Sequence, residues 1–300
     1  MKKFFLLLAL IICFNINIYS QVDTVDVEEQ GEEDKSWREK FDFDKEFELD
    51  FTSHNSPMIS LNYGMGQLSH DKFNTNFSKV NSAEIRLGYV KRMEEENSLS
   101  SIFNYNLRYL GIANTSYRLA KSKNDANINA DMWRVNIGWQ DGYGYKFGNS
   151  AIIFYDEFGI NWTRLDVKDL IINLSDREKL EMYNQSFRFG NKAEGGIKIE
   201  VIPNLSFDAA YERTAIFERV LFWKWCASVL LEVASKGLIN NFVNEIKESS
   251  PYAVPIVNFV LKNALTYGLY ELRKEKMNWP FESNAPIVND TFRFGVTFNF

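Results

Sequence analysis

The last ten residues, TFRFGVTFNF from Thr291 to Phe300, decide the fold class predicted for this chain. Their apolar side chains alternate strictly with Thr, Arg, Gly and Asn. A strand with this period of two has one apolar face and one polar face. In a soluble sandwich the apolar face would be buried against a second sheet, so the pattern alone fits both a sandwich and a membrane barrel.

The same alternation recurs upstream, after Pro57. A polar residue, Asp156, interrupts one of the apolar faces and predicts a bulge or a shifted register there. Counting the last strand, the pattern predicts eight strands; the other seven lie at about 57–69, 80–93, 98–113, 130–147, 151–164, 186–201 and 205–212.

The connections between these segments alternate in length. Short turns at 94–97, 148–150 and 202–204 recur every 54 residues, and long polar loops near 70–79, 114–129 and 165–185 lie between them. Outer-membrane barrels have short periplasmic turns and long external loops. We therefore expect both ends of the barrel chain on the periplasmic side, and an even number of strands.

In its alternating strands, its asymmetric connections and its terminal Phe, the chain resembles small outer-membrane barrels of the OmpA and OmpX type, especially those of Bacteroidota-like bacteria. The resemblance covers roughly 57–213 and 286–300. It implies an all-β membrane barrel, eight-stranded, antiparallel and up-and-down, in the outer membrane. It also implies outer-membrane lipid as a partner, and a final strand that the barrel-assembly machinery reads through an aromatic signal at Phe292, Phe294, Phe298 and Phe300.

The amino-terminal part reads as targeting and spacer sequence. Residues 1–20 have the charged start, short apolar run and small final residue of a signal peptide. Residues 21–56 are expected to form an acidic periplasmic leader, because 21–50 carry 13 acidic against four basic residues. In residues 40–51 apolar residues alternate with five acidic residues, and a strand face with five acids would suit neither lipid nor a crowded lumen, so we place that segment outside the barrel.

Overall composition narrows the function classes. Without its leader the chain is nearly neutral and has no basic stripe, which argues against nucleic-acid binding. Aromatic residues make up 15% of the chain, a content typical of barrels with aromatic girdles. After signal removal Cys226 is the remaining cysteine, so the mature chain has no intrachain disulfide.

The polar faces of the predicted strands carry charges of both signs. An eight-stranded barrel is only wide enough for side chains to fill it, and buried ionic groups need partners. A salt-bridged plug is therefore preferred to a conducting pore, although a small-solute channel or transporter stays an alternative. The predicted lumen network comprises Glu84, Arg86, Arg108, Arg134, Glu157, Arg188, Glu194, Lys198, Glu200, Asp208 and Arg293.

A helical insertion at 214–279 departs from the family pattern. The spacing predicts helices over 214–236, closed by Gly237, then 238–248 and 250–276. These helices are too apolar for water. Either they bury their apolar faces against one another, or Trp223 and its neighbours lie at the outer-leaflet interface. The strand count places the insertion outside the cell, and a count shifted by one strand would make it periplasmic; in either place it would contact a protein partner or lipid.

Catalytic motifs are sparse. Ser69, His70 and Asp71 lie at the height of the outer leaflet, which raises the alternative of a lipid-modifying enzyme. Adjacent strand residues point to opposite faces, however, so this trio cannot itself be a triad. No metal-ligand spacing, phosphate loop or nucleotide fingerprint is present, and no cofactor is expected. The sequence thus favours a non-enzymatic structural or interaction protein.

Overall fold

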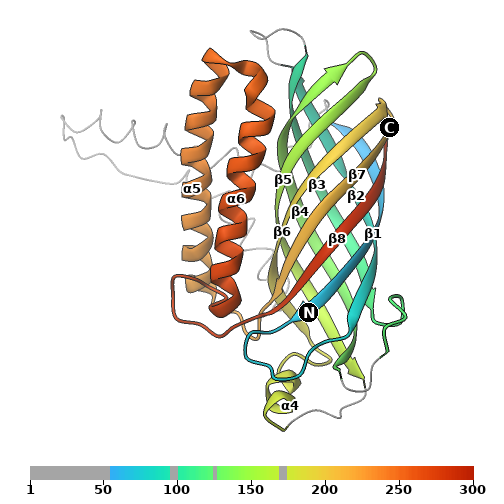
Figure 1. Ribbon diagram of the computed structural model, residues 1–300, viewed down its shortest axis with the longest axis vertical. Coiled ribbons are helices and arrows are strands. Elements are labelled where there is room, and N and C mark those ends of the chain that lie inside the picture. Colours follow the sequence, from blue (N-terminus) through green and yellow to red (C-terminus); the bar gives the residue numbers. More distant parts are fainter. Residues whose placement is uncertain (1–54, 95–100, 124–126, 169–173) are drawn as a thin grey trace, which may run out of the picture. The chain divides into compact units, whose positions relative to one another are not determined.

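The computed structural model describes residues 55–94, 101–123, 127–168 and 174–300. The predicted signal peptide, residues 40–51 and all but the last two residues of the predicted acidic leader lie outside this part of the chain; Ser56, the last leader residue, begins β1. The described residues form one closed antiparallel barrel in which each strand pairs with its neighbours in sequence (Figure 1). The strands are β1 (Ser56–Ser69), β2 (Lys79–Glu94), β3 (Ile102–Ser116), β4 (Asn129–Phe147), β5 (Ser150–Lys168), β6 (Phe187–Ile202), β7 (Leu205–Ile216) and β8 (Ile287–Asn299).

This architecture confirms the predicted fold class, including the strand number and order. The last strand pairs with both β1 and β7, with Phe298 opposite Ile59 on one side and Leu205 on the other. Its aromatic residues face outward; Phe292 is 62% exposed. Ring closure leaves no free strand edge, so the backbone polar groups of the wall pair with one another.

One predicted face is wrong. On β3 the face carrying Tyr105 and Tyr109 points into the lumen, and the face carrying Arg108 points outward. Apolar residues occur on both faces of this strand, so the period of two did not determine which face points into the lumen. The pairing of Arg86 with Gly111 fixes the choice, because directly paired residues share a face.

The bulge predicted at Asp156 is also absent, because the register of β5 runs unbroken against β4 and β6. The observed irregularity lies instead between Glu200 and Ile202 of β6. Asp156 keeps its outward position, and its burial has another cause, described below.

The lumen is filled in layers. At the long-loop end, apolar side chains from the strands and from α4 (Leu174–Glu181) and its flank, including Leu180 and Tyr183, close the barrel with a hydrophobic cap. At the short-turn end, aromatic and aliphatic residues such as Tyr105 and Ile153 form a second apolar layer. The ionic layer lies between them.

The helical insertion is a hairpin of two long helices. α5 (Phe222–Ser249) and α6 (Val254–Glu275) are joined by the 3-10 turn η1 (Pro251–Ala253). The predicted boundaries need correction: β7 continues to Ile216, and α5 runs through Gly237 without a break. A mid-helix Gly costs only about 1 kcal/mol relative to Ala, which the tertiary packing of α5 can offset.

The hairpin lies against the outside of the barrel. It leaves β7 at the long-loop end and returns along the wall beside β4, β5 and β6 (Figure 1). Its tip reaches the short-turn end, where the Tyr145 hydroxyl donates to the Tyr252 carbonyl. The insertion is therefore not confined to the long-loop end, which the strand count takes as external, but runs along the wall to the other end. Among the described residues, no helix taken by itself is long and apolar enough to cross a membrane.

Candidate functional site: the ionic layer and the docked hairpin

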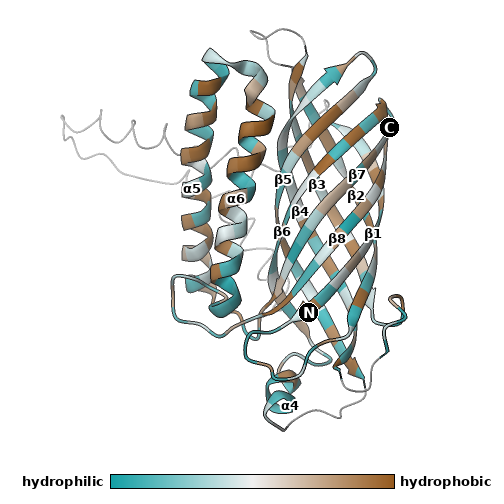
Figure 2. Ribbon diagram, viewed as in Figure 1, coloured by the Kyte–Doolittle hydropathy of each residue, from teal (hydrophilic) through white to brown (hydrophobic). Residues whose placement is uncertain are grey.

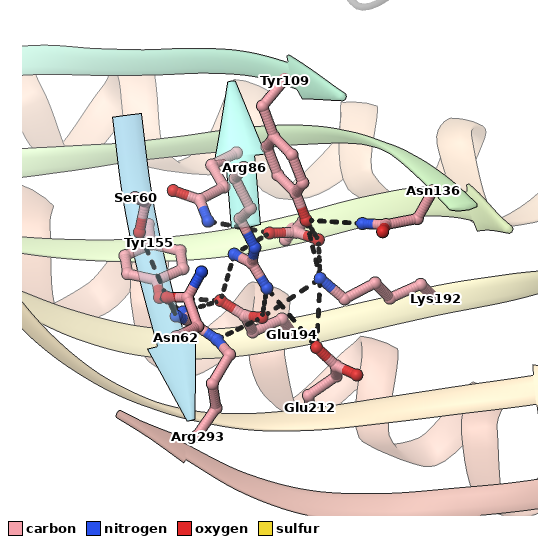
Figure 3. Close-up of polar contacts among 12 residues, drawn as sticks. Ser60, Asn62, Arg86, Tyr109, Asn136, Tyr155, Lys192, Glu194, Glu212 and Arg293 are labelled. Atoms are coloured by element: carbon pink, nitrogen blue, oxygen red, sulfur yellow. Dashed lines mark hydrogen bonds and ion pairs between the residues drawn. The ribbon is translucent and has the colours of Figure 1, made fainter. Parts of the chain in front are cut away.

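The middle of the lumen holds a connected cluster of ionised side chains (Figure 3). Arg86, on β2, is its hub and is 1% exposed. Its guanidinium lies 2.7 Å from Glu84, 2.9 Å from Glu194 and 3.4 Å from Glu212. Its guanidinium carbon also lies 4.6 Å from the centre of the Tyr109 ring. One cation thus bridges acids from three strands.

The second cation, Lys192, lies on β6 and has a fully buried side chain. Its ammonium group donates to Glu157 at 2.7 Å and lies 3.2 Å from Glu212 and 3.3 Å from Glu194. It also donates to the Tyr109 hydroxyl at 2.7 Å. Glu194 and Glu212 share this ammonium group with the arginines, whereas the other cation near Glu157 is Arg86, 3.6 Å away.

Two further arginines complete the layer. Arg134 lies 2.6 Å from Glu212, and Arg293 lies 2.6 Å from Asp208. Arg293 also donates to Glu194, at 3.0 Å through its Nε. Ion pairs at this depth gain strength from the low dielectric but repay the cost of desolvation only when most donors and acceptors are used.

Tyrosines hold the carboxylates in place. The Tyr109 hydroxyl donates to Glu157 at 2.6 Å, and the Tyr155 hydroxyl donates to Glu194 at 2.8 Å. An added Cβ at Gly138 would lie 2.4 Å from the Tyr109 ring. Glycine at that position makes room for the ring that positions Glu157.

The structure brings together seven of the eleven residues predicted for the lumen network. Glu200 and Lys198 also face inward but lie toward the short-turn end, where Glu200 pairs with Arg92 at 2.7 Å and Lys198 donates to the Tyr105 hydroxyl at 3.1 Å. The seven in the cluster are Glu84, Arg86, Arg134, Glu157, Glu194, Asp208 and Arg293.

Two predicted members do not join the cluster. Arg108 faces outward because of the reversed β3 face and lies 3.3 Å from Asp141. Arg188 lies near the long-loop end, where it donates to the Glu218 carbonyl at 2.9 Å. Lys192 was not among the predicted residues. It lies two positions before Glu194 on the same strand, so the alternation of the sequence already places both side chains on the same face.

Outside the barrel, a second group of charges fixes the hairpin to the wall. Asp156 faces outward from β5, yet it is 4% exposed because the hairpin covers it. Lys236 of α5 donates to it at 3.1 Å, and Lys262 of α6 lies 3.7 Å away. Between the helices, Arg273 lies 2.5 Å from Glu232. The residue that broke the alternation is thus the anchor of the insertion.

Contacts of the hairpin extend along the whole wall. Near the long-loop end Trp225 donates its indole N–H to Asn191 at 2.8 Å, and farther along Phe259 packs on Phe154 with ring centres 5.7 Å apart. Gly195 faces α6, and an added Cβ there would lie 1.9 Å from the Asn263 side chain. The barrel surface is therefore shaped for close approach of this helix.

His70 takes part in neither group. Its Nε2 donates to the Ala285 carbonyl at 3.1 Å, its Nδ1 accepts from the Lys72 amide at 3.1 Å, and its ring stacks on Phe73. Both ring nitrogens are thus engaged with backbone atoms, which joins the first long loop to the segment before β8.

Burial lowers the pKa of His70 below its ordinary value of 6.5, even though its bond to the Ala285 carbonyl raises it. A lowered pKa favours the neutral ring, so acidification below about pH 6.5 should weaken this loop contact, and the loss should level off once the folded pKa is passed. Hydrogen exchange of the Lys72 amide, corrected for intrinsic rates, should accelerate between pH 7 and pH 5. In His70→Gln, which does not titrate, the corrected rate should not change with pH; a pH response there would contradict this assignment.

Comparison with known proteins adds a likeness of fold. No known family model matches the sequence, and no curated protein does. A crystal structure of neisserial surface protein A has 10% identity and a TM-score of 0.38, covering 81% of this chain and 97% of that chain. The structure of Ail, the attachment invasion locus protein of Yersinia pestis, has 9% identity and a TM-score of 0.30, covering 82% and 99%.

Similarity at this level carries no argument about function. The fold is assigned from the strand order, the ring closure and the asymmetric connections described above. The chain has the architecture of a closed, eight-stranded, up-and-down barrel, which is the fold that the resemblance in its sequence implied. The docked hairpin between β7 and β8 is what distinguishes it from a bare eight-stranded barrel.

Proposed function

We propose that this protein is a non-conducting barrel of the outer membrane with a structural or interaction role, and that its helical hairpin is the part that makes contacts. The observation that carries the proposal is the filled lumen. The hub residues Arg86 and Lys192 are each 1% exposed, and Arg86 connects Glu84 on its own strand with Glu194 on the opposite wall. Water-filled channels occur in barrels of much larger strand number.

The outer wall supports the membrane location. Its side chains are largely apolar and exposed, as expected for a surface that meets hydrocarbon rather than water. Residues about half exposed on this surface include Leu61, Ile85, Leu87, Leu110, Ile112, Phe207, Ile199 and Phe294. On a soluble protein an apolar belt of this extent would drive aggregation.

Conductance across planar bilayers tests the proposal against the channel alternative. The reconstituted mature protein should produce no discrete current steps at protein levels at which a porin, as positive control, opens readily. The inserted state should be verified in the same sample by the slower electrophoretic migration of the barrel after heating. Reproducible unitary steps from the inserted protein would overturn the proposal.

A further inference from the structure

In the hairpin, polar side chains are buried and apolar side chains are exposed. Its buried positions are largely polar or charged and follow a spacing of four residues, which places them on one face of each helix. That face meets the barrel and the partner helix. The polar residues buried there are Ser228, Glu232 and Lys236 on α5, and Asn258, Lys262, Thr266 and Arg273 on α6.

The opposite face of the hairpin is apolar. Between Trp225 and Asn240 of α5, the exposed residues are Leu230, Leu231 and Leu238. Between Val254 and Tyr270 of α6, the exposed residues are Ile256, Val260, Ala264, Tyr267 and Gly268. A helical pair in water would show the reverse arrangement, so the expectation that the helices bury their own apolar faces is wrong.

Charged residues gather at the two ends of the hairpin. Glu245, Lys247 and Glu248 lie on the last turns of α5 next to the tip, and Glu271, Lys274 and Glu275 lie on the last turns of α6. Figure 2 shows the lower end of α6 in teal. The two stretches with an apolar exposed face, 225–240 and 254–270, are 16 and 17 residues long. At a rise of 1.5 Å per residue they span about 25 Å, the height of the apolar band of an outer-membrane barrel.

We propose that the outward face of the α5–α6 hairpin lies in the hydrocarbon of the membrane that surrounds the barrel, over the whole thickness of that membrane. The proposal rests on the membrane location proposed above. The occupant of this face is lipid acyl chain, because the apolar stretch matches the height of the apolar band of outer-membrane barrels and adjoins the apolar wall of this barrel. The helices remain stable there because their charges face Asp156 and one another rather than the lipid.

Spin labels on single cysteines test this placement in phosphatidylcholine vesicles. The native thiol is removed with Cys226→Ser, and labels are placed at Leu238→Cys and Val260→Cys on the hairpin, Ile85→Cys on the barrel and Ser249→Cys near the tip. All four positions are exposed, so the substitutions leave the packed interior intact. Accessibility of each label to oxygen, which partitions into lipid, is compared with accessibility to a water-soluble nickel chelate.

The labels at Leu238 and Val260 should behave like the label at Ile85, with oxygen access far above nickel access, and the label at Ser249 should show the opposite. If both hairpin labels meet the nickel chelate while Ile85 stays protected, the hairpin proposal fails and the membrane barrel stands. If Ile85 also meets the chelate, both proposals fail. Hairpin labels shielded from oxygen and nickel alike would show a protein partner or a second copy on this face, and would likewise overturn the proposal.

Discussion

Replacing Lys192 with methionine lowers the free energy of unfolding of the barrel by about 3–5 kcal/mol, the usual cost of removing one partner from a buried ion pair. Methionine retains most of the side-chain volume, so the loss is electrostatic. Glu157, Glu194 and Glu212 all lie within 3.3 Å of the lysine ammonium group. Without it Glu157 keeps Arg86, 3.6 Å away, and the layer gains one uncompensated negative charge between two apolar layers.

Denaturant unfolding of the folded barrel in detergent measures this loss as a fall in the midpoint concentration. Lys198→Met is the matched control, because it makes the same change on the same strand and the same face. Lys198 donates to the Tyr105 hydroxyl, so its replacement should cost less, about 1.5–3 kcal/mol. In Lys192→Met with Glu157→Gln, removal of one excess negative charge should recover much of the lost stability. Equal effects of the two lysine variants would disprove the special role of the ionic layer.

Replacing Asp156 with asparagine is expected to release the hairpin while leaving the barrel closed. The change is nearly isosteric, but Lys236 and Lys262 then face the wall without their carboxylate. A loss of about 3–5 kcal/mol, local to the hairpin, raises the equilibrium constant for opening of the hairpin roughly 10²- to 10⁴-fold. Hydrogen exchange of peptides from α6 should accelerate by that factor, and exchange in β1 and β8 should not change.

Asp141→Asn provides the control for this second variant. Asp141 is directly paired with Asp156 across β4 and β5 and shares its outward face, but its ionic partner is Arg108 of the barrel. Its replacement should leave exchange in α6 unchanged. Adding Lys236→Met and Lys262→Met to Asp156→Asn should restore slow exchange, because no unpaired charge is left under the hairpin. An unchanged α6 in the single variant would show that apolar packing alone holds the helices.

The sequence by itself determined the eight strands, their order and the two classes of connection, because a period of two and turn residues are local signals. It also placed Asp156 and the helical insertion as departures from the barrel pattern. Local spacing likewise marked Glu84, Arg86 and Glu194 as inward-facing. Each of these features depends on residues close together in the chain.

Two features were decided by the tertiary structure alone. The first is which face of β3 points inward, and the second is that Asp156 anchors the helical insertion to the barrel wall. The first depends on register, since a strand with two alternating faces fits the lumen either way until pairing with β2 selects one. The second depends on partners about 80 and 106 positions away, Lys236 and Lys262, which share no local pattern with β5. The direction of the hairpin follows from those partners, because buried charges must meet their counter-charges wherever the chain can bring them.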